Sequence, residues 1–255
     1  MLPMVLLYII VFLYGIIIGS FLNVLIYRIP KKENFVRTRS HCMNCGYQLE
    51  WFDLVPLFSW LALGGKCRKC KTKISVQYPL VEGLNGVLYV AVFAKYGFSV
   101  ESLLYCLLFS ALLALSVIDF RTYEIPEGFN FFILALGAIR VICDLSNWLD
   151  YAIGLLAVSA VLAIIYYVTN GAAIGGGDVK LMGASGLLLG WKLNILAFCV
   201  GCIIGAIIHP IRMKVSGEDH QLAMGPYLAA GIALAVFVGD LFLTWYLGSM
   251  GIAYK

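Results

Sequence analysis

Charged side chains are scarce in this chain: Asp, Glu, Lys and Arg make up 13% of 255 residues, about half their share in soluble domains. Hydrophobic residues make up 62%, and the mean hydropathy is +0.93. These values exclude an ordinary soluble domain and indicate an integral membrane protein. Apolar runs recur along nearly the whole chain, and each is close to the roughly 20 residues that a helix needs to cross a bilayer. We therefore expect a bundle of helices and no sheet.

Histidine is also rare, with three residues in the chain. The sequence contains neither a G-x-S-x-G nucleophile elbow nor an H-E-x-x-H zinc motif, so serine and zinc hydrolase sites lack their residues. The run Gly175–Gly177 is not part of a G-x-x-x-x-G-K-[ST] pattern and follows no strand. Nucleotide binding through a phosphate loop is therefore disfavoured.

The fold class that follows is an all-α integral membrane protein with about eight spans. The first segment has no basic region before it, which indicates a retained span and not a cleaved signal peptide. The spans are expected near 4–26, 83–98, 100–118, 127–144, 149–169, 178–191, 193–210 and 222–247. Glycine recurs in the sixth at Gly183, Gly186 and Gly190, which predicts a tightly packed core helix.

The placement of basic residues predicts the orientation. The first span is followed by Arg28, Lys31, Lys32, Arg37 and Arg39, so its carboxyl end is expected in the cytosol. Lys95, Arg140, Lys192 and Lys255 would lie on the opposite side. The chain then divides into a first span (1–27), a cytosolic loop domain (28–82) and a seven-span domain (83–255). Because the net charge of +4 is explained by this asymmetry, it does not indicate nucleic-acid binding.

Four cysteines in the loop domain form two C-x2-C pairs, Cys42 with Cys45 and Cys67 with Cys70. Four thiolates at such spacing suit tetrahedral zinc, and a small polar loop with little hydrophobic core needs a metal or a cross-link to be stable. A cytosolic location argues against disulfides, although redox pairs or uncommitted thiols stay open as alternatives. Cys199 and Cys202 have the same spacing inside an apolar span, where packing is the simpler interpretation.

Two aspartates interrupt or border apolar runs, Asp119 at the end of one span and Asp178 at the start of another. The expected topology places both at the same membrane face, where they could meet. Neighbouring carboxylates share a proton, so one can accept a proton from water while the other donates to a scissile carbonyl. The alternative is a pair of interfacial helix caps, or ion pairs with the adjacent Arg121 and Lys180.

Two further pairs of residues are candidates for the active-site region. Gly175 and Gly177 allow close backbone approach to Asp178. Gly225 and Pro226 would locally break helix and expose backbone for an extended peptide, or else form an ordinary first helical turn.

A series of motifs resembles the type IV prepilin peptidases, membrane aspartic proteases of the GxGD type. The motifs, in order, are Gly19–Asn23 with Arg28–Pro30, Arg39–Cys45, Trp51 with Pro56–Trp60, Cys67–Cys70, Tyr78–Glu82, Ile118–Asp119 with Ile125–Pro126, and Gly175–Leu181. The resemblance implies that Asp119 and Asp178 are the catalytic pair and that Gly175 and Gly177 are the two motif glycines. Together with Lys180, Gly225 and Pro226, these glycines are expected in the substrate-binding or active-site loop region. One departure is Glu127, where the family commonly has Asp.

The resemblance also implies substrates, a second activity and a location. Prepilins and pseudopilins would lose a short basic leader at the cytosolic face of the bacterial inner membrane. Many family members then methylate the new amino terminus with S-adenosylmethionine, an activity associated with the loop domain; no residue for that cofactor is evident. Composition alone would also allow an ion-coupled transporter that uses intramembrane aspartates, or an assembly component that docks through the cysteine loop.

Overall fold

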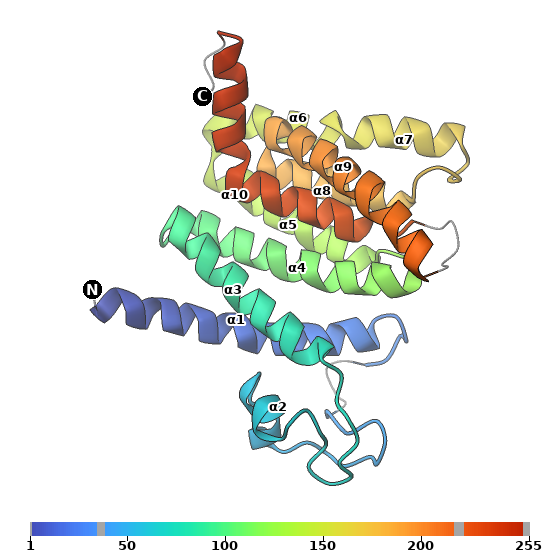
Figure 1. Ribbon diagram of the computed structural model, residues 1–255. Helices are drawn as coiled ribbons and strands as arrows, with labels where there is room; N and C mark the ends of the chain where they lie inside the picture. Colours follow the sequence, from blue (N-terminus) through green and yellow to red (C-terminus); the bar gives the residue numbers. More distant parts are fainter. Residues whose placement is uncertain (1, 35–38, 217–221, 252–255) are drawn as a thin grey trace. The chain divides into compact units, whose positions relative to one another are not determined.

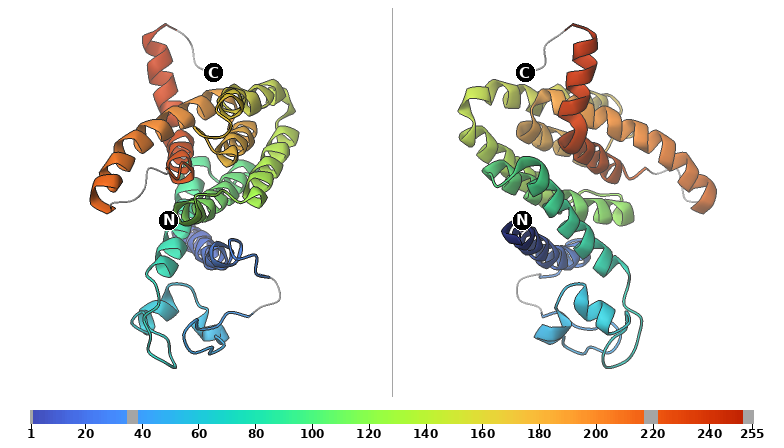
Figure 2. Two further views of the ribbon diagram at one scale, coloured as in Figure 1. Left: turned by 90° about the vertical axis from the view of Figure 1, so that its right-hand side faces the viewer. Right: turned by 60° about the vertical axis from the view of Figure 1, so that its left-hand side comes forward.

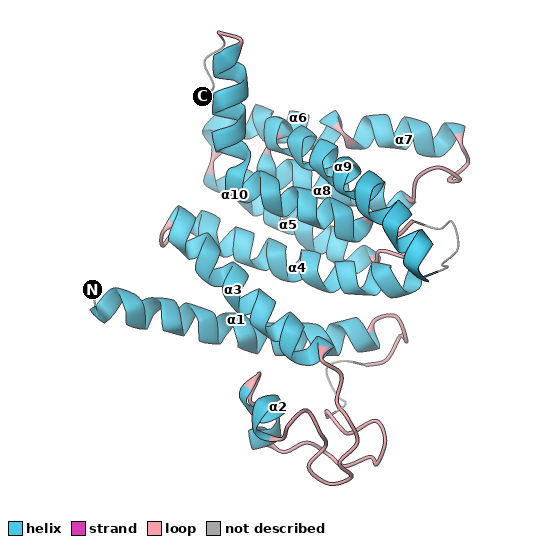
Figure 3. Cartoon of the chain, viewed as in Figure 1, coloured by secondary structure: helices cyan, strands magenta, loops and turns pink. Residues whose placement is uncertain are grey.

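A computed structural model describes residues 2–34, 39–216 and 222–251. Within these ranges all regular secondary structure is helical, with two isolated antiparallel bridges, His41 with Gln48 and Lys66 with Lys73 (Figure 3). The expected all-α class is thus confirmed for this part of the chain. Arg37 and Lys255, which entered the charge argument, lie outside the described residues. The chain divides into an amino-terminal unit, residues 1–114, and a carboxy-terminal unit, residues 115–255.

The helices follow one another with short connections (Figure 1). They are α1 (Leu2–Arg28), α2 (Phe58–Ala62), α3 (Gln77–Tyr96), α4 (Val100–Thr122), α5 (Glu127–Cys143), α6 (Trp148–Ala157), α7 (Ser159–Val168), α8 (Gly176–Leu189), α9 (Trp191–Ser216) and α10 (Gly225–Ser249), with 3-10 turns at Trp51–Asp53 and Leu145–Asn147.

Five helical segments among the described residues are long and apolar enough to cross a bilayer: Met4–Arg28, Val100–Thr122, Leu145–Val168, Trp191–Lys214 and Gly225–Ser249. The other three expected spans coincide with helices that do not qualify. Helix α5 has 17 residues and α8 has 14, fewer than the roughly 20 of a full span. Helix α3 is long enough but carries Glu82, Asn85 and Lys95. The multi-pass character is confirmed, whereas the count of eight is not.

In the amino-terminal unit, α1 and α3 pack closely along one another (Figure 2). A methyl group at Gly15 would lie 2.7 Å from Gly86 Cα, and one at Gly19 would lie 2.7 Å from Glu82 Cα. The Asn85 side chain donates a 2.7 Å hydrogen bond to the Gly15 carbonyl. Glycine therefore brings the two backbones together, and the buried amide ties them where water is excluded.

In the carboxy-terminal unit, α8 is the central helix and packs against α5, α6 and α9. Asn194 of α9 is fully buried and donates to the carbonyls of Gly154 in α6 (3.1 Å) and Met182 in α8 (3.0 Å). Its side-chain oxygen accepts a 3.2 Å hydrogen bond from the Ser185 hydroxyl. This side chain links three helices and so fixes the orientation of α8, whose first turn carries Asp178. The burial of α8 agrees with the close packing expected from its glycines.

Candidate functional site

Asp119 lies in the last turn of α4, where the apolar run ends, and only 4% of its surface is exposed. Its Oδ2 accepts a 2.8 Å hydrogen bond from the backbone N–H of Gly225, the first residue of α10. The first N–H groups of a helix have no partner inside that helix and favour an anion. The preceding residue, Met224, provides no side-chain cap. Asp119 therefore caps α10 from another helix.

Gly225 is the residue that permits this contact, because a methyl group there would lie 2.7 Å from Asp119 Oδ2. Pro226 stands in the first turn of α10, where its missing N–H costs nothing. Gly225 and Pro226 therefore form an ordinary first turn of a helix, which was one of the two alternatives expected from the sequence. The Gly225 N–H donates to the Asp119 carboxylate, so it is not free to bind an extended peptide.

Asp178 is the third residue of α8, with Gly175 at the N-cap position. Its Oδ1 is buried and has no hydrogen-bond partner in the described structure. A methyl group at Gly175 would lie 3.0 Å from Asp178 Oδ2, and one at Gly177 would lie 3.0 Å from Ile125 Cβ. Gly177 is helical and Gly175 has an ordinary extended backbone. Gly175 therefore leaves space beside the carboxylate, whereas Gly177 permits close packing against Ile125; neither residue makes an unusual turn.

The two aspartates belong to the same compact unit and lie close enough for the charge of Asp119 to act on Asp178. Like charges at short range oppose joint ionisation, so one proton shared by the pair is the stable arrangement. Asp119 has a fixed donor and Asp178 has an unsatisfied buried oxygen. The two carboxyl groups are therefore unequal before any substrate is considered.

Lys180 forms its ion pair with a residue other than Asp178. Its ammonium forms an ion pair with Glu127 of α5, and both side chains are more than half exposed. Sequence reasoning paired Lys180 with Asp178 in one alternative and left Glu127 without a role. The structure instead joins these two residues across the start of α5 and the first turn of α8.

The four loop cysteines meet in space: their sulfur atoms all lie within 4.8 Å of one another. Each pair forms the same knuckle, in which the first cysteine donates its N–H five residues ahead, Cys42 to Tyr47 (2.8 Å) and Cys67 to Thr72 (2.9 Å). No other group of three or more His, Cys, Asp or Glu in the described ranges could hold a metal. Cys199 and Cys202 stay apart from it in α9.

The donor chemistry of this cluster fits a metal that binds thiolates. Backbone N–H groups of Cys45 and Asn44 hold the pKa of the Cys42 thiol below its usual value. Hydrogen bonds with the Thr72 hydroxyl and backbone lower the pKa of Cys70 to about 5. In the same cluster, burial and hydrogen bonds with the other three cysteines raise the pKa of the Cys45 thiol to about 11, so the low-pKa thiols are Cys42 and Cys70. The cluster is therefore shaped for a four-sulfur metal centre.

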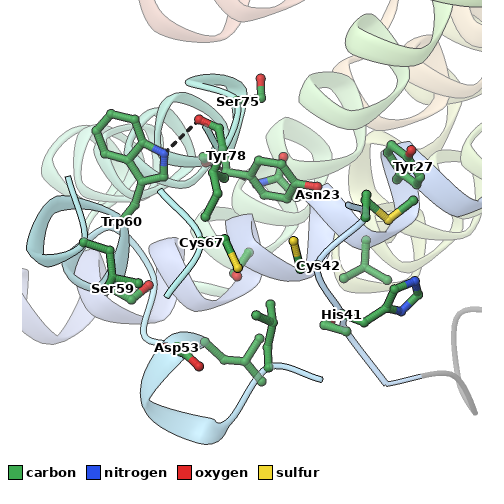
Figure 4. A pocket seen from close by; sticks show the side chains of 18 of the residues that line it. Asn23, Tyr27, His41, Cys42, Asp53, Ser59, Trp60, Cys67, Ser75 and Tyr78 are labelled. Atoms are coloured by element: carbon green, nitrogen blue, oxygen red, sulfur yellow. Dashed lines mark hydrogen bonds between the residues drawn. The ribbon is translucent and has the colours of Figure 1, made fainter. Parts of the chain in front are cut away.

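A cavity of about 470 Å³ lies beside the cluster, between the cysteine loop and helices α1 and α3 (Figure 4). Its wall includes Cys42 and Cys67 as well as three buried polar residues of the two helices, Asn23, Arg28 and Glu82. Figure 4 shows Trp60 and His41 at opposite ends of this view, with Tyr78 and Asn23 between them.

Sequence reasoning did not assign this cavity, although most of its residues stood in the motifs that carried the family resemblance. The available signal was polarity within apolar runs, because Asn23, Arg28 and Glu82 all border or interrupt hydrophobic helix. That signal does not show which polar residues converge. Convergence here depends on the loop folding back over α1 and α3.

Comparison with known proteins gives consistent matches over both units. The model of the bacterial peptidase A24 N-terminal domain matches residues 13–96, and that of the type IV leader peptidase family matches residues 106–209.

Three curated relatives named prepilin leader peptidase/N-methyltransferase illustrate the likeness. The protein of Bacillus subtilis is 33% identical, with 93% of this chain and 97% of that protein covered. That of Legionella pneumophila is 30% identical (94% and 94% covered), and that of Pseudomonas aeruginosa is 32% identical (94% and 93%). No solved structure matches the chain significantly.

Proposed function

Because the chain belongs to the type IV leader peptidase family, we propose that it cleaves prepilins with Asp119 and Asp178 as the catalytic pair and N-methylates the new amino terminus. The peptidase assignment rests on the different surroundings of the two carboxyl groups, which belong to one compact unit. Asp119 accepts a hydrogen bond from a backbone N–H, whereas the buried Oδ1 of Asp178 has no hydrogen-bond partner in the described structure. Nothing in the comparisons supports the ion-transporter alternative.

The geometry assigns different protonation states to the pair. The Gly225 N–H and the start of α10 stabilise an anion at Asp119. Asp178 Oδ1 has no donor, so the neutral acid is the less costly form there. Asp119 is thus the base, and Asp178 carries the shared proton.

Hydrolysis then needs no covalent intermediate. Asp119 takes a proton from water as the water oxygen bonds to the scissile carbonyl carbon, and Asp178 gives its proton to the carbonyl oxygen. When the C–N bond breaks, the amine leaves with the proton held on Asp119, and Asp178 regains one as the carbonyl reforms. Gly175 would leave space beside Asp178 for the peptide backbone, and Gly177 would let this turn pack closely against Ile125.

The metal and the topology complete the proposal. Cys42, Cys45, Cys67 and Cys70 would hold structural zinc, whose role is to fix the loop as a closed tetrahedral centre. The chain would be an eight-span inner-membrane protein, with the short helices α3, α5 and α8 as tilted or partial spans. Its first span would end at residue 27, its cytosolic loop domain would cover 28–82, and its seven-span domain 83–255.

With this topology, the active site would lie at the cytosolic face. Substrates would be prepilins or pseudopilins, whose hydrophobic segment would be presented from the bilayer while the basic leader stays in the cytosol. Lys180, with Gly225 and Pro226, would border the site without taking part in proton transfer.

The methyl-transfer step would use S-adenosylmethionine as donor. When bound, it supplies a methyl group: its C–S bond breaks with the electron pair staying on sulfur, while the amine nitrogen forms the N–C bond and releases one proton. The residues of this chain must therefore bind a cationic, adenine-bearing molecule.

The peptidase proposal is tested with purified protein and a prepilin, by following leader loss in single turnovers. Asp119→Asn and Asp178→Asn should each slow cleavage by about 10²–10⁴-fold, as expected for loss of general acid–base catalysis. Glu124→Gln is the matched control, because Glu124 is an exposed carboxylate between the two aspartates in sequence. Normal cleavage by either Asn variant would reject the dyad.

A further inference from the structure

The cavity beside the cysteine cluster has the dimensions and lining of a small-molecule site. Its volume, about 470 Å³, lies within the roughly 300–1,000 Å³ of ligand pockets. All of its lining residues belong to the amino-terminal unit. Neither Asp119 nor Asp178 is among the residues that line it.

Glu82 gives the cavity an unneutralised negative charge. It is 6% exposed, and its carboxylate accepts a 2.8 Å hydrogen bond from the Leu57 N–H and another from the Ser20 hydroxyl. Both donors are neutral, and no ion pair to Glu82 is present in the described residues. Asp53, also in the wall, is by contrast paired with Arg68.

The backbone of Leu57, which contacts Glu82, is strained, and its hydrogen bond to the Glu82 carboxylate helps to hold it in that conformation. Leu57 has φ of 61°, a left-handed conformation that branched residues seldom adopt. Its N–H points to Glu82 and begins α2, which carries Trp60. Strain of this kind persists where the surrounding structure requires it, often around a ligand.

Aromatic rings supply the second part of the lining. Tyr27, Trp60 and Tyr78 all line the cavity and are half-buried. The Trp60 indole N–H bonds to the Ile74 carbonyl at 3.4 Å, and the ring packs against Gly65, where a methyl group would lie 2.7 Å from it. A ring fixed in this manner can stack on a planar base or face a cation.

We propose that this cavity binds S-adenosylmethionine, with Glu82 neutralising its positive charge and Trp60 stacking on its aromatic base. The inference rests on the methyltransferase part of the proposed function and adds the location of the donor site. The volume suits one nucleoside-sized molecule better than an extended basic leader of several residues. Because Cys42 and Cys67 form part of the wall, the metal centre would shape the same site.

Direct binding is the test. Full-length protein in detergent is dialysed to equilibrium against radiolabelled S-adenosylmethionine. Glu82→Gln, which keeps an acceptor for Leu57 but removes the charge, should raise Kd by about 10-fold or more, as should Trp60→Leu. Trp51→Leu and Glu124→Gln are the controls, because both side chains are exposed and neither lines the cavity. Metal content and unfolding temperature report whether each variant is folded.

A second measurement needs no variant. Ultraviolet cross-linking of the bound donor to the wild-type chain, followed by peptide mapping, should label residues within 20–33 or 40–82, which contain the cavity lining. Labelling elsewhere, unchanged Kd in both variants, or displacement of the donor by a basic leader peptide would overturn the site. If the protein still methylates prepilin in that case, the proposed function stands and only the location fails. Absence of both binding and methylation would remove the methyltransferase function as well.

Discussion

The two regions with chemistry in this protein are held together in opposite ways. The dyad region depends on contacts between residues far apart in the chain: Asp119 caps α10, and Asn194 links α6, α8 and α9. The cysteine region depends on short local hydrogen bonds within each knuckle, such as Cys42 to Tyr47. Apolar helix packing can therefore stabilise the first region, whereas the proposed metal would stabilise the second.

The cost of burial also differs between them. Around Asp119 a buried charge is compensated by the end of a helix, which belongs to the fold itself. Around Glu82 a buried charge is met by neutral donors alone. The first arrangement is complete without a ligand, whereas the proposed cationic ligand would complete the second. Three changes, from the largest expected effect to the smallest, examine this contrast.

The largest effect should follow removal of the metal centre with Cys42→Ser and Cys67→Ser together. We expect bound metal to fall from about one per chain to none, because zinc needs the four thiolates. Without it the loop should be cut rapidly by added protease, and S-adenosylmethionine binding should be lost. Cleavage of prepilin should fall much less, since the dyad lies in the other unit. Elemental analysis and limited proteolysis measure the first two outcomes.

The matched control is Cys199→Ser with Cys202→Ser, which removes the same spacing from α9. Equal metal loss in this control, or an unchanged metal content in the loop variant, would show that the four-sulfur centre has been misassigned.

The second change, Gly225→Ala, acts on the dyad alone. The added methyl group would meet Asp119 Oδ2 and displace it from the helix end. Loss of a hydrogen bond to a charged group should slow cleavage by about 10–100-fold. The acidic limb of the pH–rate profile should move to higher pH, because the ionised carboxylate has lost its donor.

Gly128→Ala is the control for that substitution. Gly128 also stands in the first turn of a helix, α5, but no atom lies within 4 Å of a methyl group there. If Gly225→Ala lowered the rate without moving the pH profile, the contact would be structural, and the proposed division of roles between the two aspartates would fail.

The dyad region and the cysteine region also differ in how much of their structure could be predicted from the sequence. The cysteine cluster follows from spacing, because two C-x2-C pairs bring their own turn geometry. The face shared by Asp119 and Asp178 follows from topology, since one borders the end of a run and the other the start. The capping of α10 by Asp119 could not be predicted from the sequence, because Gly225 is remote in the chain and every residue except proline has a backbone N–H.

The span count and the cavity show a second limit. Hydrophobic runs indicate helices well, but α5 and α8 are too short for a full crossing once their ends are set. Asn23 and Glu82 were visible as polar residues in apolar surroundings. Their common cavity depends on how residues 39–76 fold over α1 and α3, which no periodic pattern records.

The smallest effect is expected from the Lys180–Glu127 ion pair, which borders the dyad but is open to water. Both side chains are more than half exposed, and exposed ion pairs contribute little, so Lys180→Met and Glu127→Gln should each change the cleavage rate by less than about fivefold. The double variant should equal the larger single effect, because either change already breaks the pair. A loss like that of Asp178→Asn would instead place Lys180 in the chemistry and make the dyad region depend on a surface contact. Rates measured at low and high salt distinguish these outcomes, since only an exposed pair weakens with screening.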